Sequence, residues 1–258
     1  MFTLENKNEV KVNNICIEFN NYCNNFFNNI CNNFFNNIYI QNGFYIPFIS
    51  ILCYLITQNI FLTTIITLKL FPANFFYWFH HYYDYNIPTS YNFLIQFVRF
   101  TDMGHVVSFI YFFNPSFLPI AYNVHFVITI GYWFGKIYNL IDMAKLQKPD
   151  IITWFINCWT YCNHGLPLVL LLNEIKQLKS HNDLCYEYFT LQDLMYSFSW
   201  IYFWLICIYI PWRYITNDPV YTVLSIETPI KTQFLFISLI HFLFIFSNFT
   251  GYFLFYYI

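Results

Sequence analysis

The chain has 258 residues, of which 58% are hydrophobic, 25% aromatic and only 9% charged, and its formal net charge is −2 at pH 7. A soluble domain carries roughly a quarter charged residues, so this composition excludes an ordinary water-soluble globule and predicts an integral membrane protein. The near-neutral charge does not favour nucleic acid as a partner. The eight cysteines are scattered, without a Cys-x-x-Cys or Cys/His zinc spacing. The sequence therefore predicts no disulfide framework, no metal site and no cofactor.

The first part of the chain, residues 1–42, has a different composition from the rest. The octapeptide Cys23–Ile30 recurs unchanged as Cys31–Ile38, in a segment rich in Asn and Phe. A period of eight matches neither an α-helix nor a heptad, which favours low-complexity sequence. An amphipathic segment lying on the membrane surface is the alternative. We predict two parts, a low-complexity N-terminal segment (1–42) and a transmembrane helical domain (43–258).

From residue 43 onward, long apolar runs alternate with polar or proline-containing breaks. A helix that crosses a bilayer needs about 20 apolar residues. Six runs are long enough, and they cover residues 45–71, 91–113, 117–140, 151–173, 191–212 and 233–258. The predicted fold is all-α, a polytopic transmembrane helical bundle of about six spans. Because only Asn114 and Pro115 mark the break between the second and third spans, we expect those two to form an antiparallel hairpin.

Polar residues recur at helical spacing inside four of the spans. In the second span Thr101, His105 and Ser108 share one face, and Gly104 permits close approach of another helix. The other stripes are Tyr122, His125, Thr129 and Tyr132 in the third span, Thr153, Asn157, Thr160 and His164 in the fourth, and Ser238, His241 and Asn248 in the sixth. Ionisable side chains are costly in hydrocarbon and therefore face the bundle interior. The four stripes predict a polar pocket inside the bundle.

The fourth span contains a helix-breaking cluster, Asn163-His-Gly-Leu-Pro167. Pro167 has no N–H, so the carbonyl of Asn163 loses its usual partner, and Gly165 loosens the same turn. Irregular backbone is tolerated at membrane depth where it lines a cavity or is buried in protein. His164 is therefore a candidate for proton transfer near neutral pH. The structural alternative is a histidine that only hydrogen-bonds a neighbouring helix.

Three segments, in order along the chain, resemble a known family. They are Arg99–Phe113, Trp159–Glu174, and a region with Trp204 followed by Thr216–Leu224. Over residues 90–258 this pattern resembles the androgen-induced membrane hydrolases, whose relatives include the androgen-dependent regulator of tissue factor pathway inhibitor.

The resemblance implies a six-span enzyme that hydrolyses fatty acid esters of hydroxy fatty acids. It assigns Thr101 as the nucleophile and His164 as its base, although Asp102 occupies the nucleophile's position in the animal spacing. Such a threonine needs a base to remove its proton, and a nearby donor such as Asn163 would stabilise the oxyanion. Asp102 and His105 are the other supporting residues. The expected partner is a lipid substrate that enters from the bilayer, and the expected location is the endoplasmic reticulum.

Two other functions remain open from the sequence. The intramembrane histidines and Asp102 also suit a non-enzymatic transporter, or a protein that binds protons or a metal. The same site could also carry out acyl transfer, which differs from hydrolysis only in whether water reaches the acyl-enzyme.

Overall fold

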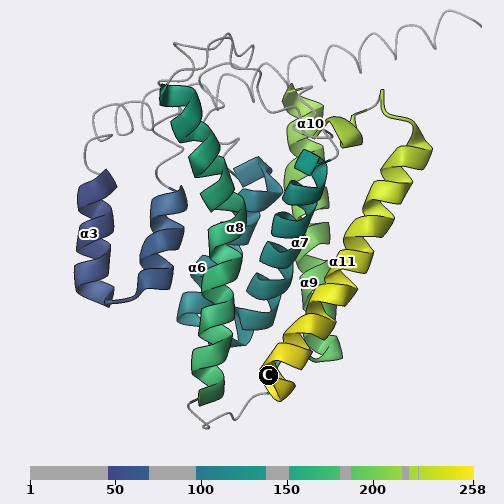
Figure 1. Cartoon of the computed structure of the whole chain (residues 1–258). Coiled ribbons are helices and arrows are strands. Elements are labelled where there is room, and N and C mark those ends of the chain that lie inside the picture. Colours follow the sequence, from purple (N-terminus) through teal and green to yellow (C-terminus); the bar gives the residue numbers. More distant parts are fainter. Residues whose placement is uncertain (1–45, 70–96, 138–150, 181–186, 217–220, 226) are drawn as a thin grey trace, which may run out of the picture. The chain divides into compact units, whose positions relative to one another are not determined.

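The computed structural model describes residues 46–69, 97–137, 151–180, 187–216, 221–225 and 227–258, and every regular element in these ranges is helical (Figure 1). The low-complexity segment 1–42 lies outside them. All described residues except Ile46 belong to one unit, Pro47–Leu70 with Phe97–Ile258. Three helical runs are long and apolar enough to cross a membrane, namely Pro115–Ile137, Leu191–Thr216 and Ile230–Tyr257.

The predicted span 45–71 is not a single helix. It consists of α3 (Ile46–Thr57) and a second helix, Ile60–Lys69, which fold back on each other (Figure 1). Gln58 turns the chain with φ 49°, and the Asn59 side chain caps the second helix by accepting from the Leu62 N–H at 2.8 Å. At about 1.5 Å per residue, the described part of neither helix reaches 30 Å, the thickness of a bilayer core. The expectation of one span here is therefore wrong.

The predicted hairpin is confirmed as a pair of helices, and the second of them belongs to the candidate span Pro115–Ile137. α6 (Phe100–Phe113) ends at Asn114, the short helix η4 (Pro115–Phe117) makes the turn, and α7 (Leu118–Ile137) returns. Gly104 lies against α7 so closely that an added Cβ would be 2.6 Å from Ile128 Cδ1. The glycine therefore sets the distance between the two helices, as its place in the polar stripe predicts.

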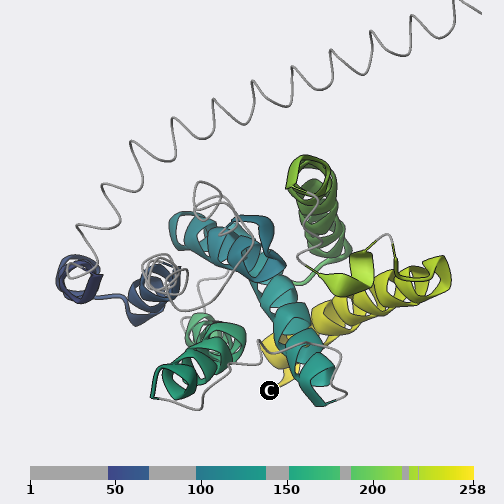
Figure 2. The same ribbon diagram turned by 90° about the horizontal axis from the view of Figure 1, so that it is seen from above.

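The helix α7 is the centre of the described bundle. It packs against α6, α8 (Ile151–Ser180), α9 (Leu191–Phe203) and α11 (Ile230–Tyr257). Of its most apolar 18 residues 61% are buried, compared with 22% and 28% in the other two candidate spans. In both views α7 lies between α8 and α11 (Figures 1 and 2). A membrane helix covered by protein on most sides can carry polar groups, because those groups find partners within the bundle.

One set of such groups joins α7 to α9 and α11. Asn123 is fully buried and donates from Nδ2 to Ser197 Oγ and Asn248 Oδ1, each at 3.0 Å. Its Oδ1 accepts from Ser247 Oγ at 2.9 Å. Because buried amides are costly unless they are bonded, this network fixes how the three helices meet.

The run from Leu191 to Thr216 is helical throughout but not uniform. The helix α9 passes into a π-helical turn, η5 (Trp204–Tyr209), and then into α10 (Ile210–Thr216). The capping box of Thr190 and Asp193 starts this run, with both reciprocal bonds present. A short 3-10 turn, η6 (Thr222–Leu224), lies between α10 and α11. π-helical turns are rare and often lie at functional sites.

Candidate functional site

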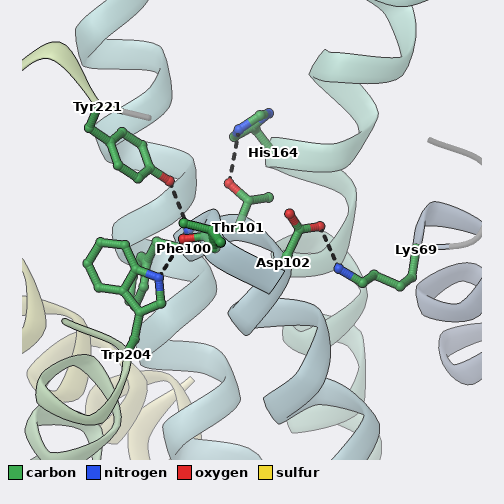
Figure 3. A network of polar contacts seen from close by, with 8 residues as sticks. Lys69, Phe100, Thr101, Asp102, His164, Trp204 and Tyr221 are labelled. Atoms are coloured by element: carbon green, nitrogen blue, oxygen red, sulfur yellow. Dashed lines mark hydrogen bonds and ion pairs between the residues drawn. The ribbon is translucent and has the colours of Figure 1, made fainter. Parts of the chain in front are cut away.

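Thr101 and His164 meet inside the bundle, although 63 residues separate them in the chain. The Thr101 hydroxyl, Oγ1, is 3.2 Å from His164 Nε2 (Figure 3). Thr101 lies in the first turn of α6, and His164 lies midway along α8. Thr101 is buried, and His164 is half-buried. These are the two residues that the family resemblance implies as nucleophile and base, and their roles remain a prediction.

The other ring nitrogen determines which tautomer the neutral imidazole adopts. His164 Nδ1 is 2.7 Å from the Thr160 carbonyl, which can only accept, so Nδ1 carries the proton. Nε2 then presents its lone pair to the Thr101 hydroxyl. A general base for that hydroxyl requires this arrangement.

Two residues of α7 hold His164 in place. Tyr132 stacks on its ring with centroids 3.9 Å apart and planes inclined by 15°. The Thr129 hydroxyl donates to the His164 backbone carbonyl at 2.6 Å. Both belong to the polar stripe predicted for the third span, which therefore faces the site. The ring of His164 has little freedom to rotate away from Thr101.

Asp102 does not point toward His164. Its Oδ1 forms an ion pair with Lys69 Nζ at 2.8 Å, which joins the hairpin helix Ile60–Lys69 to α6 (Figure 3). Arg99 adds a second positive charge that acts on Asp102 and His164. Lys69 is missing from the sequence-predicted site because nothing in its spacing links it to Asp102. The two cations and one carboxylate leave a net positive charge beside the Thr101 hydroxyl.

The backbone just before Thr101 is held by two aromatic residues from elsewhere in the chain. Trp204 Nε1 donates to the Val98 carbonyl at 2.7 Å, and the Phe100 N–H donates to the Tyr221 hydroxyl at 2.8 Å (Figure 3). Burial raises the pKa of Tyr221 to about 12, so this hydroxyl stays neutral at physiological pH. Sequence reasoning noted Trp204 only within the family pattern and assigned no role to Tyr221.

His105 and His125 form a second buried pair between α6 and α7. Their ring centroids are 5.8 Å apart, and His125 Nε2 is 2.9 Å from Ser108 Oγ. Neither ring nitrogen of His105 has a hydrogen-bond partner among the described residues. Among the described residues His105 has no hydrogen bond to Thr101 or His164, and its supporting role stays a prediction.

Among the described residues, Asn163 is not hydrogen-bonded to Thr101 or His164. Its Oδ1 is buried and has no hydrogen-bond partner in the part of the chain that the structure describes. The helix α8 continues through Pro167, so the cluster does not end the helix. The proposed oxyanion role of Asn163 stays a prediction that no contact supports.

The stripe expected in the sixth span divides between two environments. Asn248 is buried in the network of α7, α9 and α11, whereas Ser238 is exposed. His241 is 2.6 Å from the Tyr202 hydroxyl in an exposed contact. The expectation that all four stripes meet in one pocket is therefore wrong for α11, because its buried residues all lie between Leu243 and Phe255.

Within the described ranges, no three His, Cys, Asp or Glu side chains are arranged to hold a metal ion. The chain matches no family model, no curated protein and no solved structure. The inference of function therefore depends on the geometry of the site and on the resemblance in sequence.

Proposed function

We propose that this protein is an integral membrane hydrolase of lipid esters, of the type that acts on fatty acid esters of hydroxy fatty acids. The observation that carries the proposal is the hydroxyl of Thr101 at 3.2 Å from a histidine nitrogen whose lone pair is free to accept its proton. A threonine hydroxyl is a poor nucleophile without such a base.

In the first half of the reaction, His164 Nε2 takes the proton of Thr101 Oγ1 as that oxygen attacks the ester carbonyl. The tetrahedral intermediate then expels the alcohol, which receives the proton from Nε2 and leaves an acyl-threonine ester. In the first turn of α6 the Phe100 N–H is bonded to the Tyr221 hydroxyl, and the Asp102 and Met103 N–H groups are bonded to the Arg99 carbonyl, so the donor for the developing oxyanion is left to the Thr101 N–H or to a side chain. The positive charge of Arg99 acts on His164 and would favour a negative charge developing beside it, whereas the charge of Lys69 is paired with Asp102.

In the second half, His164 removes a proton from water, and the hydroxide attacks the acyl-threonine. Collapse of this intermediate returns the proton to Thr101 and releases the free acid. If another alcohol replaced water, the same steps would give acyl transfer. Access of water to the acyl-enzyme alone separates the two reactions.

We further propose that α6 and α8 also lie within the membrane, so that the chain is multi-pass and the site opens inside the bundle. Thr101 is 12 residues before Phe113, or about 18 Å along α6 at 1.5 Å per residue. The ester of a lipid in the bilayer would reach this depth laterally. The hairpin of α3 and Ile60–Lys69 takes the place of the first predicted span. We still expect the protein to reside in the endoplasmic reticulum.

The test is ester hydrolysis by the purified full chain in detergent, with a nitrophenyl ester and a branched fatty acid ester as substrates. We expect Thr101→Ala and His164→Ala each to reduce kcat/KM by about 100-fold or more, since acid–base catalysis contributes roughly 10²–10⁴-fold. Thr101→Ser should retain measurable turnover. The matched controls are Thr232→Ala and His241→Ala, which remove the same residue types away from the site.

The outcomes separate the assignments. A wild-type protein that is inert on both esters refutes the hydrolase. Loss of activity in His164→Ala but not in Thr101→Ala would support His164 as the base and show that Thr101 is not the nucleophile. Asp102 would then be the next residue to test as the nucleophile. Loss in a control variant would show that the assay reports on folding and not on the site.

The second candidate function is proton transport without catalysis. The observations that favour it are the buried Lys69–Asp102 ion pair and the adjacent pair of His105 and His125. The protein reconstituted in vesicles with a pH gradient would then dissipate that gradient. The Asp102→Asn variant would leave the gradient intact. Ester hydrolysis without proton flux would eliminate this candidate.

A further inference from the structure

The start of α6 is held from outside the helix by hydrogen bonds on both sides of Arg99. One bond goes from Trp204 Nε1 to the Val98 carbonyl, and the other goes from the Phe100 N–H to the Tyr221 hydroxyl. Both involve backbone groups, so they fix the path of the main chain irrespective of which side chains it carries. Figure 3 shows the two aromatic residues on one side of Thr101 and Lys69 on the other.

We call Trp204 and Tyr221 the clamp. Packing between aromatic rings strengthens its hold on the start of α6. The Trp204 ring lies 5.1 Å from the Phe100 ring and 6.0 Å from the Tyr221 ring, measured between centroids. Trp204 and Val98 are 5% and 3% exposed, so the bond between them is shielded from competing water. A shielded hydrogen bond with ring contacts around it restrains its backbone more firmly than an exposed one.

The two residues of the clamp come from parts of the chain with unusual backbone. Trp204 opens the π-helical turn η5, and Tyr221 precedes the 3-10 turn η6. A π-helical turn places one more residue in a turn than an α-helix, so it changes the direction in which the following side chains point. Tyr209, from the same turn, packs on Trp204 at 5.2 Å. The irregular turn thus brings aromatic rings to the segment that precedes Thr101.

Within the described residues, neither Trp204 nor Tyr221 is hydrogen-bonded to Thr101 or His164. We propose that they are positioning residues, which fix the first turn of α6 so that the Thr101 hydroxyl meets His164 Nε2. This inference rests on the proposed function for its effect on turnover. A displacement of about 1 Å in a reacting group can cost on the order of 100-fold in rate.

The first experiment measures ester hydrolysis by Trp204→Phe and Tyr221→Phe in the full-length protein. Each change keeps a ring and removes one hydrogen-bonding group. We expect kcat to fall about tenfold or more in each variant with KM changed less than threefold, because the reacting hydroxyl moves while the lipid-binding surface stays. The matched controls are Trp200→Phe, whose Nε1 has no hydrogen-bond partner in the described part of the chain, and Tyr202→Phe, which loses a bond to His241.

The second experiment needs no hydrolase activity. In a Thr101→Cys protein the introduced thiol faces His164, which favours the thiolate and speeds alkylation. Its alkylation by iodoacetamide at pH 7 is quantified at the peptide level by mass spectrometry, so the natural cysteines do not interfere. We expect this thiol to react about tenfold faster than the same thiol in a Thr101→Cys/His164→Ala protein. Adding Trp204→Phe should abolish the difference, and adding Trp200→Phe should preserve it.

The two experiments fail in different ways. If the wild-type protein hydrolyses no ester, the proposed function is refuted, and the alkylation rates still test the clamp. If Trp204→Phe and Tyr221→Phe retain the acceleration that depends on His164, the clamp does not position Thr101. Absence of any such acceleration in the Thr101→Cys protein would also overturn the inference, because the pair that the clamp is said to align would not exist.

Discussion

The ion pair of Lys69 and Asp102 gives a sharp test of how the hairpin is attached to the bundle. The two charged atoms are 2.8 Å apart, and the side chains are 20% and 7% exposed. We compare Asp102→Leu, Lys69→Met and the double variant. In each single variant one charge stays behind without its partner, whereas the double variant replaces both charges by apolar groups of similar size.

The magnitude follows from two opposing terms. At an effective dielectric constant of about 20, unit charges 2.8 Å apart attract by about 6 kcal/mol. Removing each ion from water costs several kcal/mol, so the intact pair contributes little net stability. Breaking a buried pair typically costs about 3–5 kcal/mol because the remaining charge is uncompensated. The cost of Asp102→Leu should lie at the upper end of this range, since the substitution removes the carboxylate that acts on both Lys69 and Arg99.

The assay is unfolding in mixed micelles by titration with sodium dodecyl sulfate, followed by circular dichroism. We expect each single variant to lower the free energy of unfolding by about 3–5 kcal/mol, and the double variant to lie within about 1 kcal/mol of the wild type. A cost below about 1 kcal/mol for Asp102→Leu, or a double variant as unstable as the sum of the singles, would refute the reasoning.

Three further predictions concern the packing of the helices, and each is measured by the same unfolding titration. Gly104→Ala should destabilise the protein by about 1–3 kcal/mol, since its Cβ would meet Ile128 at 2.6 Å, while Gly165→Ala, with nothing within 4 Å, should be neutral or stabilising. Asn123→Leu should cost at least about 2 kcal/mol because it removes three buried hydrogen bonds that join α7 to α9 and α11; an unchanged midpoint would show that these bonds contribute no net stability. Asn59→Ala should cost about 1 kcal/mol by removing the helix cap, and no loss would mean that the hairpin turn does not need it.

The short break at Asn114 and Pro115 predicts the α6–α7 hairpin, and periodicity predicts which side of each helix is covered. The stripe of α7 could be read from sequence, and His125 and Tyr132 are both buried as the spacing requires. The same reasoning fails for residues 45–71. That run is apolar enough for one span, but Gln58 and Asn59 break it into two helices. A hydropathy count registers two polar residues in a long run, but it does not register a cap and a left-handed turn.

The candidate site could be predicted in part, for a related reason. A stripe shows which side of a helix faces protein, so His164 and Thr101 could be identified separately, but not the other helix that each one meets. Lys69, Trp204 and Tyr221 carry no periodic signal, because each acts through tertiary contacts with residues far away in the sequence. Such contacts depend on the register between helices, which composition and spacing leave undetermined.

The sixth predicted span shows why a polar stripe along a helix does not by itself predict a buried site. His241 lies two turns before Asn248 on the same face of α11. Asn248 is bonded to α7, whereas His241 contacts Tyr202 in an exposed position. The face is correct, but only the C-terminal half of α11 is packed, with Gly251 so close to Phe189 that an added Cβ would be 2.3 Å from the ring. Helices that cross at an angle separate away from their point of closest approach. A side chain therefore joins a buried site when it lies near that point, and His241 lies outside the part of α11 that holds its buried residues.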